Sequence, residues 1–437
     1  MLKDRSDEGD GGDRRHDSVA ILRREKWMKE LFQAVTIKEA REIVLNHVSF
    51  PREGEKVSLL SALDRCLLHD VVAVDDVPGF DRSTMDGFAV RARDTFGASE
   101  GLPAYLEVAG EVLMGVAPGG ELKPGQAWRI ATGGMLPPGA DAVVMVEHTE
   151  ELDEKTIGVT RPVAPGENVV RRGEDVPAGS VVLPAGHRLR PQDLGILAAA
   201  GVVAVEVRRP LRVGIISTGD EVVSPEEKPA PGQVRDINSY TLYGAVAACG
   251  GEPRLYGIVR DDFYQLQERL ARALSENDMV LLSGGSSVGT RDVAARVIDS
   301  LGQPGVLFHG VSLKPGKPSV GAVVNGKPVF GLPGHPASAL VVFELLVAPL
   351  IRSYSYPQES FWEFPLRARI TRNLRSAAGR EDFVRVKLRL QDGELHAEPV
   401  LGKSGLITTM VRADGLARIP AGKEGVEAGE WVEVKLF

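Results

Sequence analysis

Four apolar runs in the second half of the chain are each followed by polar or glycine-rich residues, and these positions could do chemistry. In an open sheet of parallel strands, ligands bind beyond the carboxyl ends of the strands, so we expect the four segments to line one crevice. The candidate binding residues are Thr218, Gly219, Asp220 and Glu221 after the first run, Asp261 and Asp262 after the second, Ser283, Gly284, Gly285 and Ser286 after the third, and Pro333, Gly334, His335 and Ser338 after the fourth.

The loop at 283–289, with the sequence SGGSSVG, is expected to hold an anion. Its glycines leave backbone N–H groups unhindered, and it leads straight into a helix N-terminus, where peptide dipoles favour negative charge. A tight turn would have the same composition. Three neighbouring loops at the same sheet edge favour the phosphate or oxyanion site.

Five carboxylates fall near the same crevice, where uncompensated like charges would be costly. They are Asp220, Glu221, Asp261, Asp262 and Asp292. A bound cation would resolve the repulsion, and oxygen ligands without a Cys/His pair at zinc spacing favour Mg²⁺ bridged to substrate phosphates. Asp262 and Asp292 also suit helix N-caps, and the two roles are not exclusive.

Two lysines, Lys314 and Lys317, lie in the segment KPGKP, whose prolines stiffen the backbone. Preorganised positive charge suits an anionic ligand, and a solvated basic turn is the alternative. Asp86 and Thr132 lie in turns that could be structural only. His335 is expected to line the pocket, because no Ser-His-Asp or Cys-His arrangement can be recognised around it.

The elements that would position these residues alternate between strand and helix from 211 to 351, which predicts a mostly parallel, doubly wound α/β sheet. The helix expected at 263–276 has an apolar stripe on one face. Polar and apolar residues alternate after 357, which predicts a small β-barrel or sandwich at the end of the chain.

The first half of the chain combines helices with a β-rich segment. Thr36 and Glu39 form a capping-box pattern that begins one helix, a short helix is expected at 61–68, and a third begins near Pro191. Between them, at 81–171, short β-patterned runs separated by Gly and Pro predict a small β-domain.

The composition is that of an ordinary globular protein: 437 residues, 43% hydrophobic and 26% charged. With 52 Lys and Arg against 60 Asp and Glu, the formal net charge is −8, which argues against a generic nucleic-acid binder. The most apolar stretch, 337–351, is interrupted by Glu344 and Pro349 and falls short of the ~20 residues of a membrane span. The first 33 residues are expected to be a mobile tail without a signal peptide, in a cytoplasmic protein.

Taken in order, the motifs of this chain form a specific set. They are STMDGFAV, RIATGGMLPPGADAVVMVE, RPQDLGILAAAGV, ISTGDEVV, GQVRDINSY, GIVRDD, SGGSSVG, KPGKP and GLPGHPASAL. From about residue 30 to the C-terminus, the chain strongly resembles the MoeA family of molybdopterin molybdenumtransferases, to which the E domain of gephyrin corresponds. The resemblance implies four domains: an elongated helical domain at 34–80 and 172–205, a β-rich domain at 81–171, a MogA-like α/β domain at 206–352 and a β-barrel at 357–437.

The resemblance also implies the activity, which is Mg²⁺-dependent insertion of molybdate into adenylylated molybdopterin with release of AMP to form molybdenum cofactor. The matching functional residues are Asp86, Thr132, Glu221, Asp261, Asp292, Lys314 and Lys317, of which Glu221, Asp261 and Asp292 would hold the metal. It further implies a homodimer in which Asp86 and Thr132 complete the partner's site. A MogA-like molybdopterin adenylyltransferase would supply the substrate, and neither nucleic acid nor membrane is an expected partner.

One position departs from the family pattern: Gly310 stands where the family often has a lysine, four residues before Lys314. Lys314 and Lys317 are therefore expected to carry more of the oxyanion binding, and a lysine restored at Gly310 should tighten it. The choice between molybdate and tungstate stays open. The alternatives are a tungstate-inserting paralogue, a non-catalytic molybdopterin-binding or scaffold protein, and a nucleotide or nucleotide-sugar hydrolase, which the matching flanking domains disfavour.

Overall fold

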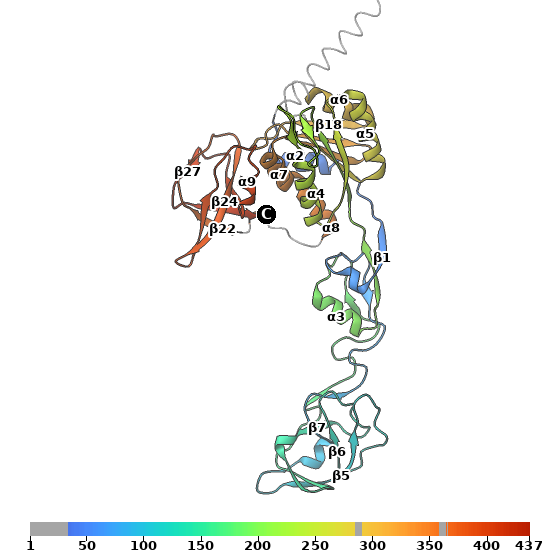
Figure 1. The fold of residues 1–437 in the computed structure, drawn as a ribbon. Helices are drawn as coiled ribbons and strands as arrows, with labels where there is room; N and C mark the ends of the chain where they lie inside the picture. Colours follow the sequence, from blue (N-terminus) through green and yellow to red (C-terminus); the bar gives the residue numbers. More distant parts are fainter. Residues whose placement is uncertain (1–33, 285–290, 358–363, 365) are drawn as a thin grey trace, which may run out of the picture. The chain divides into compact units, whose positions relative to one another are not determined.

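The computed structural model of this chain describes residues 34–284, 291–357, 364 and 366–437. The expected mobile tail therefore lies outside the described residues. The chain divides into two compact units: residues up to Glu53 together with Arg209–Phe437, and Gly54–Arg208. Figure 1 shows the elements of both units in sequence colours.

The first unit contains a six-stranded sheet with four parallel strands side by side. In spatial order the strands are β16 (Glu252–Val259), β13 (Arg212–Thr218), β17 (Met279–Ser283), β21 (Lys327–Leu332), β20 (Val320–Val324) and β18 (Pro304–His309). The predicted parallel α/β sheet is thus confirmed for its first four strands. The apolar runs of β13, β17 and β21 are buried, as strands covered on both faces require, whereas the edge strand β16 is only partly buried. The remaining two pair antiparallel, and β18 was not predicted.

Helices cover both faces of this sheet (Figure 1). One core includes buried residues of α2 (Ile37–Leu45), α4 (Asn238–Ala248), α7 (Pro336–Val342) and α8 (Ala348–Ser355). The other includes α5 (Phe263–Glu276) and α6 (Arg291–Leu301). In α5 the predicted stripe is confirmed, because Leu266, Leu270 and Leu274 are buried.

The predicted capping box of α2 is confirmed. Thr36 Oγ1 accepts a hydrogen bond from the Glu39 backbone N–H at 3.2 Å, and Glu39 Oε2 accepts one from the Thr36 backbone N–H at 2.8 Å. The buried face of this helix, with Ile37, Ala40 and Val44, packs into the core of the α/β sheet. Hydrophobic burial therefore joins α2 to the first unit, whereas the resemblance assigns it to the helical domain. The four-domain boundaries themselves stay a prediction.

Between α7 and α8 the chain forms a π-helical turn, Phe343–Val347. The whole helical stretch Pro336–Ser355 has 20 residues and is apolar enough to cross a membrane, but 78% of its most apolar window is buried inside the protein. Such burial is the pattern of a core helix, and the other described helices do not reach this length and hydropathy.

The C-terminal part of the first unit is a barrel of five strands. Each strand pairs with the next, and β24 pairs with β26 to close the ring: β24 (Glu381–Gln391), β25 (Glu394–Pro399), β22 (Leu366–Ile370), β28 (Trp431–Leu436) and β26 (Gly415–Ile419). The predicted β-barrel is confirmed. A short strand of the α/β region, β19 (Leu313–Lys314), pairs in parallel with β24 and places Lys314 opposite Asp382. Short elements complete the C-terminal part: α9 (Thr408–Val411) and β23 (Leu374–Arg375), which pairs with β27 (Gly425–Val426). The α/β region has one further short pair, β14 (Val222–Val223) with β15 (Val234–Arg235).

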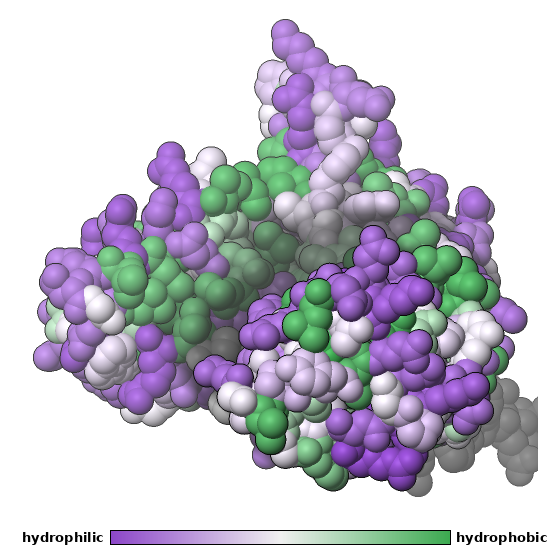
Figure 2. Space-filling model, turned by 90° about the horizontal axis from the view of Figure 1, so that it is seen from below, coloured by the Kyte–Doolittle hydropathy of each residue, from purple (hydrophilic) through white to green (hydrophobic). Residues whose placement is uncertain are grey.

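The second unit is dominated by β-structure. Its main sheet has the order β7 (Ala142–Met145), β4 (Gly87–Val90), β6 (Gln126–Ile130), β5 (Ala104–Val112), β9 (Thr156–Val159) and β8 (Thr149–Asp153). The predicted β-domain is therefore present. The large hydrophobic side chains exposed in this unit include Leu113, Met114 and Val116, which follow β5. On the face drawn in Figure 2, hydrophobic residues gather in patches among hydrophilic ones.

The rest of the second unit is less helical than expected. It contains the two-stranded pairs β1 (Gly54–Ser58) with β12 (Ala204–Arg208), β2 (Val71–Val72) with β11 (Val181–Leu183) and β3 (Arg82–Ser83) with β10 (Val169–Val170), and the helix α3 (Pro191–Ala199). The helix predicted at 61–68 is wrong. Only a 3₁₀ turn, Leu59–Ala62, is found near there, because the following residues pair with distant segments, such as Cys66 with Arg188.

Candidate functional site

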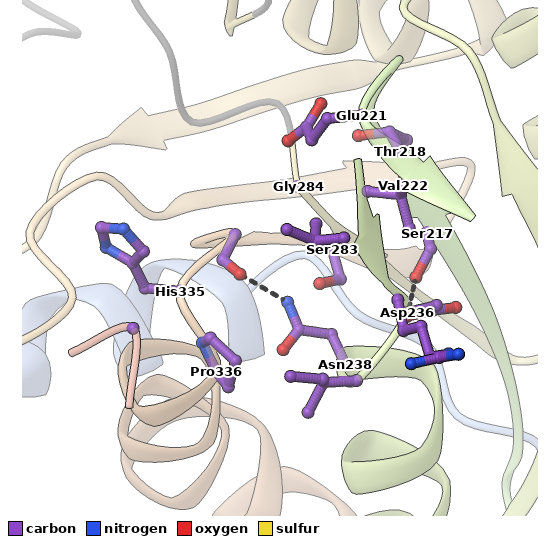
Figure 3. A pocket seen from close by; sticks show the side chains of 15 residues that line it. Ser217, Thr218, Glu221, Val222, Asp236, Asn238, Ser283, Gly284, His335 and Pro336 are labelled. Carbon is purple, nitrogen blue, oxygen red and sulfur yellow. Dashed lines mark hydrogen bonds between the residues drawn. The ribbon is translucent and has the colours of Figure 1, made fainter. Parts of the chain in front are cut away.

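A cavity of about 350 Å³ lies at the carboxyl edge of the parallel strands (Figure 3). Because β16, β13, β17 and β21 are parallel neighbours, their ends meet at this edge. The predicted residues that line it are Thr218, the last residue of β13, and Glu221; Ser283, the last residue of β17, and Gly284; and Gly334 and His335 after β21. The structure thus brings these six residues together around one cavity at the strand ends.

Gly284 shows why the strand-end loops need glycine. Its φ is +117°, and a Cβ atom there would lie 2.0 Å from the carbonyl oxygen of Thr218. Any side chain would therefore push β13 and β17 apart at the floor of the cavity. The next residues of this loop, Gly285 and Ser286, lie outside the described residues.

Two polar side chains of this cavity, those of Asp236 and Asn238, lie in the motif GQVRDINSY, for which the sequence predicted no role. Asp236 Oδ1 accepts a hydrogen bond from the Ser217 hydroxyl at 2.9 Å, and Asn238 Nδ2 donates one to the carbonyl oxygen of Gly334 at 2.9 Å. Figure 3 shows both side chains among those that surround the cavity. Their bonds tie the start of α4 to the ends of β13 and β21. The motif GQVRDINSY was the available signal for them.

The predicted carboxylates divide into two groups. Asp262 caps α5, because its Oδ1 accepts the Gln265 backbone N–H at 2.9 Å. Asp220 and Asp261 lie close together, with the Asp261 backbone N–H 3.4 Å from Asp220 Oδ1. Burial, followed by repulsion from Asp220 and Glu221, raises the pKa of Asp261. Asp292 lies within α6, and its side chain is outside the described part of the chain.

This carboxylate group fits Mg²⁺ on its chemistry. Asp220 and Glu221 lie close enough to Asp261 for their repulsion to add to the effect of burial on its pKa, so the three carboxylates form one acidic group. Among the described residues, no three His, Cys, Asp or Glu side chains gather closely enough to hold a metal ion by themselves. Mg²⁺ is commonly held by only one or two carboxylates together with waters and substrate phosphates, so this donor set is compatible with it.

A second cavity, of about 530 Å³, lies where the α/β region meets the barrel. The predicted residues that line it are Lys314, Lys317, Pro333, His335 and Ser338. Residues 374–404 supply further lining side chains that sequence reasoning missed, namely Arg375, Arg380, Asp382, Arg385, Lys403 and Ser404. The sequence signal there was strand alternation, which carries no information about a distant partner. Six cations and one carboxylate make this cavity strongly electropositive among its described residues.

Arg385 is the most deeply buried cation of this second cavity that the structure describes. Only 8% of the residue is exposed, and its Nη2 donates to the carbonyl oxygen of Gly402 at 2.8 Å. Burial lowers the pKa of its guanidinium group. Since no carboxylate pairs with it among the described residues, Arg385 presents positive charge for which a bound anion would compensate.

His335 lines both cavities and joins them. Its Nδ1 lies 3.1 Å from the hydroxyl oxygen of Ser404, and the Ala337 backbone N–H donates to the carbonyl oxygen of Ser404 at 3.1 Å. The loop after β21 is thereby bound to the barrel. An extended ligand could occupy both cavities past the imidazole ring.

Asp86 and Thr132 belong to the second unit, where they contact each other. The Thr132 backbone N–H and hydroxyl both donate to Asp86 Oδ1. Both residues are exposed, so these two predicted side chains form an ordered, solvent-facing pair.

Comparisons with known proteins agree along the chain. Residues 35–201 match the family "MoeA N-terminal region (domain I and II)", residues 214–353 match "Probable molybdopterin binding domain", and residues 367–437 match "MoeA C-terminal region (domain IV)". A Methanocaldococcus jannaschii protein named for molybdopterin biosynthesis is 39% identical over 94% of this chain and 100% of its own length. The molybdopterin molybdenumtransferase of Bacillus subtilis is 36% identical over 91% of this chain and 93% of its own.

Among solved structures, a molybdopterin biosynthesis MoeA protein from Pyrococcus horikoshii has a TM-score of 0.81 and 38% identity. The match covers 92% of this chain and 99% of that one. Sequence likeness and fold thus extend through both units and the barrel, and the chain belongs to the MoeA family.

Proposed function

We propose that this protein is a molybdopterin molybdenumtransferase, which inserts molybdate into adenylylated molybdopterin and releases AMP to form molybdenum cofactor. The observation that carries the proposal is the pair of cavities joined at His335. One is lined by strand-end acids and glycines, and the other by lysines and arginines. This suits a reaction between a pyrophosphate-bearing pterin and an oxyanion.

The second cavity, called the cationic cavity below, is proposed to bind the oxyanion. Molybdate is a tetrahedral dianion, and each of its oxygens can accept charge-assisted hydrogen bonds. Lys314, Lys317 and Arg385 offer donors from two sides of the cavity, and Arg385 does so from a buried position. The assay of AMP release described below, run with molybdate and with tungstate, distinguishes the two oxyanions.

The cavity at the strand ends is proposed to take the adenylylated pterin. Thr218, Ser283 and Gly284 line this cavity and are proposed to contact its phosphates. Gly219 and Asp220 follow Thr218 in the sequence, Gly285 and Ser286 follow Gly284, and they are proposed to contribute to the same site. Mg²⁺, held by Glu221, Asp261 and Asp292, would neutralise charge on the phosphoanhydride and polarise it for cleavage.

The proposal includes a homodimer in the cytoplasm, with substrate supplied by a MogA-like adenylyltransferase. Asp86 and Thr132 would complete the site of the partner subunit. Support for a contact comes from an exposed apolar side chain nearby: the terminal methyl of Met114 lies 3.4 Å from where a Cβ atom on Gly133, the residue after Thr132, would stand. Exposed apolar groups next to a preorganised carboxylate suit a surface that becomes covered.

The decisive experiment measures AMP release from adenylylated molybdopterin by the full chain, with molybdate, with tungstate and with neither. We expect release that depends on the oxyanion and on Mg²⁺. Pterin binding without AMP release would instead indicate a scaffold protein, and AMP release without oxyanion would indicate a hydrolase. A preference for tungstate would identify the tungstate-inserting alternative.

The metal assignment has a matched pair of variants. Asp261→Asn removes a carboxylate from the crevice, whereas Asp262→Asn changes the neighbouring residue, whose carboxylate caps α5. We expect only Asp261→Asn to raise the Mg²⁺ concentration needed for half-maximal AMP release. An equal Mg²⁺ requirement for both variants would remove Asp261 from the metal site.

A further inference from the structure

The cationic cavity contains one buried carboxylate among its described lining residues, that of Asp382. Only 4% of this residue is exposed. An acid in an anion-binding cavity opposes the ligand by charge, so its presence requires a physical reason. The reason offered here rests on the proposed function of this cavity as the oxyanion site.

Each oxygen of Asp382 contacts a different cation. Oδ2 lies 3.6 Å from Nζ of Lys314, and Oδ1 accepts a hydrogen bond from Nε of Arg380 at 3.0 Å. Lys314 comes from the α/β region, whereas Arg380 and Asp382 come from the start of the barrel. The carboxylate therefore bridges the two parts of the chain that form the cavity.

The backbone fixes the position of this bridge. Lys314 is the register partner of Asp382 in the parallel pair β19–β24, and the Glu381 backbone N–H donates to the carbonyl oxygen of Ser312 at 3.1 Å. The side chains of Lys314 and Arg380 are 56% and 36% exposed, so without a partner both would move freely at the cavity wall. Asp382 restricts them.

The two cations retain donors for a ligand. An ammonium group has three N–H donors and a guanidinium group has five, and the contacts with Asp382 occupy only part of them. A pair of cations at fixed spacing matches the oxygens of a tetrahedral dianion. Two mobile cations would attract any anion with little regard to its shape.

We propose that Asp382 is a positioning residue that holds Lys314 and Arg380 at the spacing required by a tetrahedral oxyanion dianion, and thereby gives the cavity its selectivity. Removing the charge of Asp382 then has two opposite effects. The affinity of the cavity for anions of any shape is unchanged or increases, because the cavity loses the one negative charge among its described lining residues. Preference for the dianion decreases, because the cation pair is no longer held.

The test compares two anions that differ in shape and charge. Molybdate binding to the full chain is measured by equilibrium dialysis at low ionic strength, and nitrate, a planar monoanion, is measured as a competitor. For Asp382→Asn we expect the dissociation constant of molybdate to rise tenfold or more, while that of nitrate is unchanged or falls. A purely structural role would weaken both anions together.

Glu394→Gln is the matched control. It removes one negative charge from the same barrel, at a surface pair with Arg369 outside the cavity. It should leave the ratio of the two dissociation constants as in the unaltered protein. If Asp382→Asn does not fold, Asp382→Glu keeps the charge but moves the carboxylate by one methylene, and we expect a smaller loss of molybdate preference.

If the ratio of the molybdate and nitrate dissociation constants stays within twofold of that of the unaltered protein in Asp382→Asn, or in Asp382→Glu where Asp382→Asn does not fold, the positioning role is overturned. It is also overturned if the unaltered chain binds no molybdate. The proposed transferase activity is judged separately, by oxyanion-dependent AMP release from the unaltered chain. The two proposals can therefore fail independently.

Discussion

Thr132 donates two hydrogen bonds to a single oxygen of Asp86: its backbone N–H lies 2.6 Å and its hydroxyl oxygen 2.8 Å from Oδ1. The backbone bond, and then the hydroxyl bond, lower the pKa of Asp86 because they stabilise the ionised carboxylate. The second carboxylate oxygen, Oδ2, accepts no hydrogen bond from the described residues, so it is open to a ligand or a partner. An exposed acid is thereby kept ionised and oriented.

Thr132→Val tests this relationship, since it removes the hydroxyl donor and keeps the backbone donor. We expect the pKa of Asp86 to rise toward its ordinary value, as measured by NMR titration of the carboxyl carbon. Thr149→Val is the control, because that hydroxyl bonds the carbonyl oxygen of Val146 in the same unit. An Asp86 pKa that is the same in both variants would contradict the assignment.

Arg385→Met should separate anion binding from folding. Loss of a charge-assisted hydrogen bond to the oxyanion, about 1.5–3 kcal/mol, is expected to raise the molybdate concentration for half-saturation roughly tenfold or more. The free energy of unfolding in urea should change by only about 1 kcal/mol, because the desolvation cost of a buried cation offsets its lost bond to Gly402.

Arg389→Met is the control on the same strand, where the arginine forms an exposed pair with Glu398. Its molybdate titration should match that of the unaltered protein. A normal titration for Arg385→Met as well would show that the buried guanidinium does not contact the oxyanion.

Asp193 should make the second unit sensitive to acid. Burial raises the pKa of this carboxyl, but hydrogen bonds from Arg190 and His187 outweigh burial and bring the pKa from 3.8 to about 2. Because the folded pKa is lowered, the stabilisation is present above pH 4 and is lost as the pH falls through 2. Its size is about 2 kcal/mol.

Urea unfolding between pH 5 and pH 2 checks this expectation. The difference in unfolding free energy between the unaltered protein and Asp193→Asn should shrink as the pH falls below 4. Glu100→Gln, at an exposed acid of the same unit, should show no such trend. A constant difference for Asp193→Asn over this range would refute the pKa assignment.

Gly310→Lys is expected to weaken the protein rather than improve the site. The sequence suggested that a lysine here would tighten oxyanion binding, but Gly310 has a φ of +117°, a region that L-residues rarely adopt. We expect a loss of about 1–2 kcal/mol in unfolding free energy and no gain in molybdate affinity. Gly310→Ala should lose a similar amount, and a stable lysine variant with tighter binding would contradict this.

Mixed subunits test the shared site of the proposed dimer. An Asp86→Asn chain and a Lys314→Ala chain, each inactive alone, should regain activity when mixed and allowed to exchange. Random exchange makes half of the dimers mixed, and each has one intact site of two, so about a quarter of full activity is expected.

The control mixture pairs Asp86→Asn with the double variant Asp86→Asn/Lys314→Ala, which cannot form an intact site. It should stay inactive. If the first mixture also stays inactive after subunit exchange has been verified by mass spectrometry, the site lies within one chain.

Much of the α/β half could be predicted from the sequence, for local reasons. The run at 213–216 is apolar throughout because β13 is covered on both faces, and the leucines of α5 recur at helical spacing because only one face is buried. Parallel connectivity then requires the strand ends to share an edge. The sequence alone therefore places Glu221, Ser283 and His335 at one crevice, and all three line the first cavity.

The cationic cavity was only half predictable. Lys314 and Lys317 were recognised from their motif. Arg385 lies 71 residues beyond Lys314, in a segment that reads as an ordinary alternating strand, and Ser404 lies 90 residues beyond Lys314, in a turn after β25. The parallel register between Lys314 and Asp382 brings them together. That register depends on how the barrel closes, which no local spacing encodes.

The sequence by itself determined which residues could bind an anion or a cation and at which strand ends they lie. It could do so because hydrophobic periodicity and chain connectivity are local properties. Only the tertiary structure decided that His335 joins two cavities, that α2 packs in the first unit and that Gly310 needs a positive φ. Each of these depends on contacts between residues far apart in the chain. Their free energies are set by the packing of the whole unit and not by neighbours in the sequence.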